Sequence, residues 1–135
     1  MTENEIAREI VDAAFKIHKR LGPGLLESVY EKVMIHELRA RSLKVENQVP
    51  VPIEYEGLKI ADAFRADLLV EDKVIVELKS VEETVAVHKK QLITYVRLTD
   101  KRLGLLINFG SALIKNGITR IVNKLDDVMI EEFAG

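Results

Sequence analysis

A carboxylate and an ammonium group lie two residues apart in an otherwise apolar segment. The segment is Val74–Lys79, where Glu77 and Lys79 interrupt an apolar, β-branched run typical of a strand covered on both faces. Charges in such a strand are costly unless each finds a partner. Because residues i and i+2 of a strand point to one face, Glu77 and Lys79 project together. A buried acid, a second acid and a lysine are the groups that metal-dependent phosphodiester hydrolysis requires.

The second acid is Asp67, ten residues before Glu77. If the intervening hairpin has a three-residue loop at 71–73, Val70 faces Val74 and Asp67 lies directly across from Glu77. Like charges placed directly opposite each other are destabilising, and two buried carboxylates repel unless something positive lies between them. A divalent cation such as Mg²⁺, Mn²⁺ or Ca²⁺ suits carboxylate oxygens and would satisfy both groups.

Two alternatives are open at this point. A two-residue loop would place Asp67 opposite Val76 and turn the two acids to opposite faces, so the metal-site hypothesis requires the longer loop. The acids are also compatible with a purely structural role, in which Glu77 pairs with Lys79 and Asp67 pairs with Arg65. Apolar residues on both faces of the strand make the functional and structural interpretations about equally favoured.

Two helices offer further polar groups. Glu27 opens the second expected helix and shares a face with Tyr30, although an acid at this position also stabilises the helix dipole. Gln91 and Tyr95 are four residues apart on a later helix, so both can reach one site; a lone tyrosine at this spacing is more often a core residue. His88, one turn before Gln91, is expected to be a half-exposed structural histidine.

The elements that must position these groups follow from periodicity and from the turn residues. Thr2 with Glu5 forms a capping box for the first helix, which ends at Gly22-Pro23-Gly24. The expected order is ααβββαββα, in a mixed α/β sheet flanked by helices. The expected spans are helices to Leu21, at about 25–41, at about 84–98 and from near Asn123, and strands at about 45–55, 58–70, 74–79, 102–109 and 118–122.

Three details of these elements are specific enough to test. Pro50 and Pro52 cannot donate to a β-ladder, which predicts an edge strand. The long second strand is expected to bend or bulge near 61–63. The inward side of the second helix is expected to carry Leu26, Tyr30, Val33 and Met34.

Composition restricts the class of protein. A chain of 135 residues, 47% hydrophobic and 31% charged, is expected to form one globular domain over residues 1–135. It contains no cysteine, which excludes disulfides, zinc–thiolate sites and thiol nucleophiles. With no long apolar stretch and no basic leader, we expect a soluble, cytoplasmic protein without membrane contact. The net charge of −2 does not favour a strongly basic nucleic-acid binder.

Taken in order along the chain, these motifs resemble the PD-(D/E)XK nuclease superfamily, and more narrowly its GxxExxY family. The resemblance covers nearly the whole chain, and the proline that often precedes the first acid is replaced by Ala66. The matching motifs are Gly24-x-x-Glu27-x-x-Tyr30, Val49-Pro50-Val51, Arg65-Ala66-Asp67, Val76-Glu77-Leu78-Lys79, Gln91-x-x-x-Tyr95 and the run from Gly104 to Gly110.

The resemblance implies a restriction-endonuclease-like fold with the acids clustered where the central strands diverge. It implies that Asp67 and Glu77 bind Mg²⁺ (or Mn²⁺), with the carbonyl of Leu78, and that Glu27 completes the shell. Lys79 would assist the attacking water. Gln91 and Tyr95 would position the site or contact the nucleic-acid backbone.

The implied function is a metal-dependent nuclease that hydrolyses phosphodiester bonds of DNA, or of RNA. The alternative is a non-catalytic nucleic-acid-binding or protein-interaction module that retains the nuclease fold. A homodimer is a further expectation, because small nucleases often need a second subunit to enclose a duplex.

Overall fold

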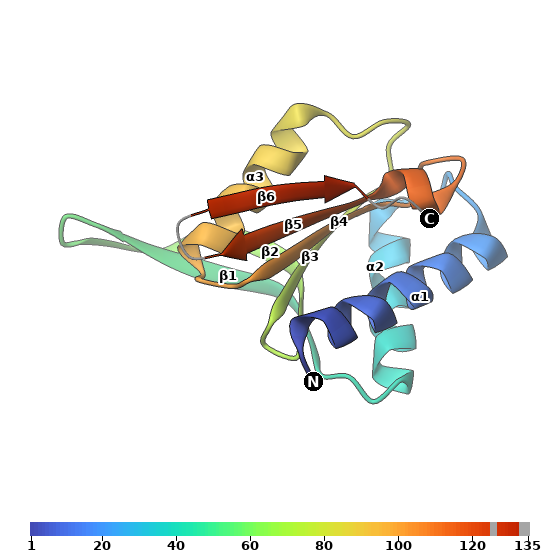
Figure 1. Ribbon diagram of the computed structural model, residues 1–135, viewed down its shortest axis with the longest axis horizontal. Coiled ribbons are helices and arrows are strands. Elements are labelled where there is room, and N and C mark those ends of the chain that lie inside the picture. Colours follow the sequence, from blue (N-terminus) through green and yellow to red (C-terminus); the bar gives the residue numbers. More distant parts are fainter. Residues whose placement is uncertain (125–126, 133–135) are drawn as a thin grey trace.

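The chain forms three α-helices, a short 3₁₀ helix and six strands in the part that the structure describes (Figure 1). The structure, a computed structural model, describes residues 1–124 and 127–132. The elements are α1 (Glu3–Leu21), α2 (Glu27–Ala40), β1 (Val45–Tyr55), β2 (Leu58–Val70), β3 (Val74–Lys79), α3 (Ala86–Leu98), β4 (Leu103–Asn108), η1 (Ile114–Gly117), β5 (Ile118–Lys124) and β6 (Asp127–Glu132).

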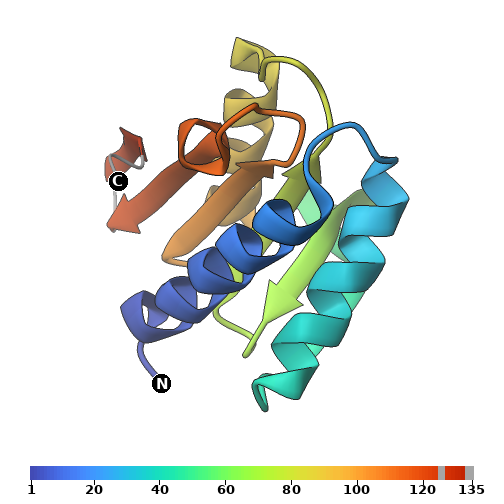
Figure 2. The same cartoon turned by 90° about the vertical axis from the view of Figure 1, so that its right-hand side faces the viewer.

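All six strands belong to one mixed sheet in the order β1-β2-β3-β4-β5-β6. Only β3 and β4 pair in parallel, because α3 crosses over between them; the other neighbours are antiparallel. Helices α1 and α2 lie on one face of the sheet and α3 lies on the other (Figure 2). The expected mixed α/β sheet flanked by helices is therefore confirmed. None of the described helices is both long enough and apolar enough to cross a bilayer.

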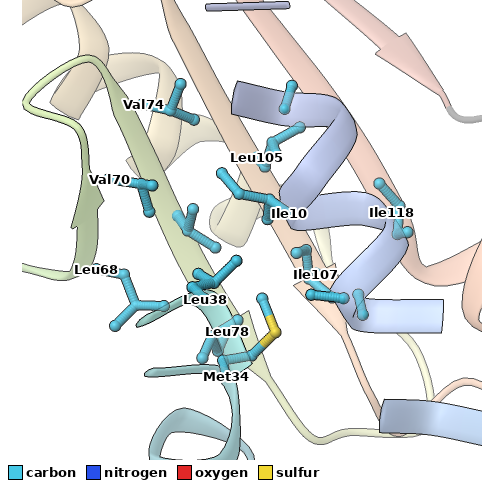
Figure 3. Packing of buried hydrophobic residues seen from close by; sticks show 14 of the residues in the cluster. Ile10, Met34, Leu38, Leu68, Val70, Val74, Leu78, Leu105, Ile107 and Ile118 are labelled. Carbon is cyan, nitrogen blue, oxygen red and sulfur yellow. The ribbon is translucent and has the colours of Figure 1, made fainter. Parts of the chain in front are cut away.

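Two apolar clusters hold these layers together. The larger lies between the sheet and the pair α1 and α2, where Ile10 and Met34 meet Leu68, Leu78 and Ile107 from the strands (Figure 3). The smaller lies under α3, which contributes Leu92 and Val96. Alternation along β3 explains the split, since Val74, Val76 and Leu78 join the larger cluster while Ile75 joins the smaller one.

The start of α1 and the edge strand follow the sequence predictions. The Thr2 hydroxyl accepts a hydrogen bond from the Glu5 N–H at 3.2 Å and so caps α1. Strand β1, with its two prolines, is at the edge of the sheet. The β1–β2 register shifts between Val51 and Ile53, opposite residues 61–63, so the predicted bulge is also confirmed.

Two structural predictions were wrong. The expected last helix near Asn123 is absent from the described residues. Asn123 lies within β5, and Asp127–Glu132 form β6 instead. The edge of β5 offers unpaired backbone groups that this segment satisfies, with Ile121 opposite Ile130. Residues 125–126 and 133–135 of that expected helix lie outside the described residues. Leu26, expected to face inward, is the residue before the first turn of α2 and is 72% exposed.

Candidate active site

The two acids meet where β2 and β3 separate. The ladder between these strands pairs Val70 with Val74 and runs only as far as Leu68 and Val76. This is the register of the three-residue loop, which places Asp67 and Glu77 opposite each other just beyond the last pair. The Leu78 N–H donates to Asp67 Oδ2 at 2.8 Å, and the Asp67 N–H donates to Glu77 Oε2 at 3.3 Å. The sequence prediction of a facing acid pair is confirmed.

This arrangement disfavours ionisation of Glu77. Its residue is only 8% exposed. Burial, followed by hydrogen bonding to Asp67 and repulsion from its charge, raises the pKa of Glu77 to about 9, while Lys79 opposes the shift weakly. A protonated Glu77 carboxyl can donate its proton in a hydrogen bond to the Asp67 carboxylate, and in this sense the two acids share one proton.

A chain of hydrogen bonds joins the loop before α2, the helix that begins at Glu27, to the end of β3. The buried Tyr30 ring stacks on Phe109 with 4.5 Å between centroids. Its hydroxyl donates to the Gly22 carbonyl and accepts from the Leu25 N–H. The Leu25 carbonyl in turn accepts from the Ser80 hydroxyl at 2.6 Å. The loop before α2 is thereby fixed to the residue that follows Lys79.

The charged groups that shift the pKa of Glu27 include members of the acid site. Although the residue is exposed, partial burial of its carboxylate raises the Glu27 pKa. Lys79 opposes this shift, while Asp67 and Glu31 add to it. Glu27 therefore lies within electrostatic range of both Lys79 and Asp67.

Helix α3 brings Tyr95 to the same site. Burial and the negative charges of Glu77 and Asp67 raise the pKa of the Tyr95 phenol. Its ring stacks on Phe64 of β2 with centroids 3.9 Å apart, which fixes its orientation. Gln91, one turn earlier, is exposed and makes no hydrogen bond to the residues that the structure describes.

His88 has the structural role that was expected of it. Its Nδ1 accepts a hydrogen bond from the Val85 N–H at 3.3 Å and so caps α3. Burial and the nearby charge of Lys79 lower its pKa. His88 is thus a half-buried cap beside the site.

Sequence reasoning missed Gln48 and its partner Glu31. The Gln48 amide donates to Glu31 Oε1 at 2.9 Å and to Asp67 Oδ1 at 3.4 Å. Its backbone has φ of 50°, a left-handed conformation that is unusual for a non-glycine residue in a strand. At this point the side-chain alternation of β1 and β2 shifts by one residue. Val45 packs in the larger cluster, whereas Val49, an even number of residues later, packs against the smaller cluster on the other face. The i+4 spacing of Glu31 from Glu27 was a usable signal; nothing in the sequence marks Gln48.

Asn108 at the end of β4 and Gly110 just after it hold the backbone that follows Lys79. The buried Asn108 side chain accepts from the Val81 and Gly110 N–H groups, each at 3.0 Å, and donates to the Val81 carbonyl. A Cβ on Gly110 would lie 2.1 Å from the Val81 carbonyl oxygen, so only glycine fits. Asn108 and Gly110 therefore fix the segment that leaves Lys79 and carries Ser80.

The donor set fits a hard divalent cation held largely by water. No three His, Cys, Asp or Glu side chains of the described residues are close enough together to hold one metal ion. The facing pair of Asp67 and Glu77 supplies two carboxylates, which is the usual protein contribution to a Mg²⁺ site that keeps several waters. The shared proton of the pair is the group that a cation would replace.

Comparison with known proteins agrees with this geometry. The family model described as the PD-(D/E)XK nuclease superfamily matches residues 4–121, which include both acids, Lys79, Glu27, Gln91 and Tyr95. Neither the curated proteins nor the solved structures gave a match. The narrower GxxExxY assignment stays a prediction. The chain belongs to the PD-(D/E)XK nuclease superfamily.

Proposed function

We propose that this protein is a Mg²⁺-dependent nuclease, and that residues 1–135 form one domain carrying its active site. The observation that carries the proposal is the pair of half-buried Asp67 and buried Glu77 at the end of the β2–β3 ladder. Superfamily membership supports nuclease activity and a nucleic-acid substrate in general terms. We take DNA as the substrate, with RNA as the alternative, and a homodimer as the assembly.

Each residue has a role that follows from its position. Asp67 and Glu77 would hold Mg²⁺ or Mn²⁺, together with the Leu78 carbonyl. Glu27, which lies in electrostatic range of the pair, would bind through a water molecule. When bound, the ion supplies Lewis-acid charge to the phosphate and to the attacking water.

The lysine and the α3 residues would act on the substrate. Lys79 projects on the same face as Glu77, where its ammonium would orient the attacking water or take its proton, and stabilise negative charge on the phosphate. Tyr95, held by Phe64, would position the acids or contact the nucleic-acid backbone. Gln91 is exposed one turn away, where it can contact that backbone.

The test measures cleavage of single- and double-stranded DNA and RNA with Mg²⁺, with Mn²⁺ and with a chelator. Asp67→Asn and Lys79→Met should each lower the metal-dependent rate by about 100-fold or more. Asp72→Asn and Lys73→Met, in the exposed turn of the same hairpin, are matched controls that should retain full activity.

Two outcomes would contradict the proposal. Cleavage that persists unchanged in Asp67→Asn and Lys79→Met would exclude this site. Metal-independent nucleic-acid binding without cleavage, equal in wild type and Asp67→Asn, would favour the non-catalytic module that retains the fold.

A further inference from the structure

The end of the β1–β2 hairpin forms an arm that leaves the body of the protein. We define the arm as residues 52–63, which extend to the left in Figure 1. Residues 54–63 are all exposed, including Tyr55 at 66% and Leu58 at 61%. Two-stranded ribbons are at best marginally stable in water without a third layer. The arm therefore lacks, within the described residues, the cover that its length requires.

The strand register collects the apolar side chains on one side of the arm. Tyr55 pairs with Leu58, and Ile53 pairs with Ile60. Because residues i and i+2 share a face, these two cross-strand pairs form one apolar face of the ribbon. A contiguous exposed apolar patch of this kind marks an interaction surface.

The charge of the arm selects the kind of partner. The arm contains three acidic residues, Glu54, Glu56 and Asp62, and one lysine, Lys59. Asp62 is paired with Arg65 at 3.0 Å, just outside the arm, so Glu54, Glu56 and Lys59 leave a net charge of −1. Negative charge repels nucleic-acid phosphates and anionic lipid head groups. The arm therefore suits a protein surface with an apolar floor and a basic rim.

This protein carries such a surface at its other end. A groove of about 450 Å³ lies between the last turns of α1 and the segment around η1. Leu113 and Ile114 contribute apolar side chains to its lining, and Leu113 is 56% exposed. Its charged lining residues are Lys16, Lys19, Lys115 and Asp12. Lys16 is paired with Glu37 and Asp12 with Arg41, so the positive charge of the groove comes from Lys19 and Lys115. The groove is thus complementary to the arm in both charge and polarity.

The arm and the groove lie at opposite ends of the longest axis of the molecule (Figure 1). One chain cannot join them, but two chains lying side by side and antiparallel bring each arm to the groove of the other. We propose that the protein is a two-fold symmetric dimer in which the arms are exchanged in this way. Such a dimer forms each contact twice and closes, whereas a head-to-tail arrangement would continue into open chains.

The first test is the oligomeric state by sedimentation equilibrium, which does not depend on nuclease activity. We expect a closed dimer at micromolar concentration. Replacing Tyr55 and Leu58 together by serine should weaken the dimer at least about 100-fold. Each of these apolar side chains is buried in both of the symmetric contacts, so each substitution removes two buried side chains from the dimer. Leu98→Ser, an equally exposed leucine on α3, should leave the dimer unchanged.

Charge reversal tests whether the groove is the docking site. Glu56→Lys at the tip of the arm and Lys115→Glu at the groove should each weaken the dimer about tenfold at low salt. Placing both changes in one chain should restore most of the affinity, because each altered arm then meets an altered groove.

Crosslinking tests the same contact directly, since the chain has no cysteine of its own. Mixed Leu58→Cys and Leu113→Cys chains should form a disulfide-linked heterodimer, and neither variant should crosslink alone. A monomer at every concentration, or efficient crosslinking of Leu58→Cys alone through arm-to-arm contact, would overturn the proposal.

Discussion

The proton shared at the acid pair predicts an unusual loss of stability at high pH in metal-free protein. The native state holds a proton on Glu77 up to about pH 9, whereas an unfolded glutamate has lost it above about pH 4.5. A raised folded-state pKa means that this group's stabilising contribution is fully present below the unfolded pKa and is lost as pH rises through the folded pKa. The free energy of unfolding should therefore fall between about pH 5 and pH 9.

The size of the slope follows from linkage. If the native state binds one proton more than the unfolded state, the free energy of unfolding falls by at most about 1.4 kcal/mol per pH unit. Over four units that limit amounts to about 5–6 kcal/mol, as much as the whole stability of a domain at the lower end of the typical range of about 5–15 kcal/mol. Relaxation and water entry around the ionised pair reduce the slope, so we expect about 0.5–1 kcal/mol per pH unit.

The perturbation that isolates this effect is Glu77→Gln, which copies the protonated side chain. Its amide oxygen can still accept from the Asp67 N–H, and its NH₂ group can donate to the Asp67 carboxylate. Urea unfolding in chelator, from pH 5 to pH 9, should show the Glu77 slope in wild type and in the exposed control Glu56→Gln. The slope should be absent from Glu77→Gln.

Adding Mg²⁺ extends the same experiment. A cation favours the ionised pair, so saturating Mg²⁺ at pH 8 should stabilise wild type by RT ln(1 + [Mg²⁺]/Kd) and stabilise Glu77→Gln less. Equal pH slopes in wild type and Glu77→Gln would refute the shared proton. Equal stabilisation of both by Mg²⁺ would refute the metal site at this pair.

Two further predictions concern the residues that support the site. Gln48→Gly removes the cost of the left-handed backbone conformation, but it also removes the amide that contacts Asp67 and Glu31. Calorimetry should show Mg²⁺ binding weakened about fivefold, while the unfolding free energy changes by less than about 1 kcal/mol. Unchanged Mg²⁺ affinity would contradict a role for Gln48 at the site. Gly110→Ala places a Cβ against the Val81 backbone and should lower the unfolding free energy by about 2–4 kcal/mol, measured by urea denaturation. Gly57→Ala, where there is open space and only a positive φ to oppose the change, should lose about 1 kcal/mol; equal losses at both glycines would refute the steric argument.

Local rules were sufficient for most of the elements and limited the acid pair to two arrangements. Alternation within Val74–Lys79 placed Glu77 and Lys79 on one face, whereas the length of the turn between β2 and β3, seen in the structure, set Asp67 opposite Glu77. These relations depend on the two-residue period of a strand and on one short loop, so only the loop length was left open by the sequence.

Local rules failed where a distant part of the chain supplied the deciding contact. The segment Asp127–Glu132 became a strand because β5 presents a free edge, although its sequence was expected to be helical. Leu26 had the right helical spacing to be buried, but the hydrogen bonds of Tyr30 and Ser80 hold the preceding loop at the rim of the sheet, where Leu26 meets solvent.

The sequence by itself identified the candidate site residues and limited Asp67 and Glu77 to two hairpin registers. Tertiary structure alone decided that Glu27 and Tyr95, from helices on opposite faces of the sheet, lie within electrostatic range of that pair, and that Gln48 contacts Asp67 from the neighbouring strand. The physical reason is that β2 and β3 separate at the acids. Beyond the last ladder pair the side chains of Asp67 and Glu77 join the two strands, and the groups that come near them are set by how α2 and α3 pack. Packing between distant elements leaves no periodic signal in the sequence.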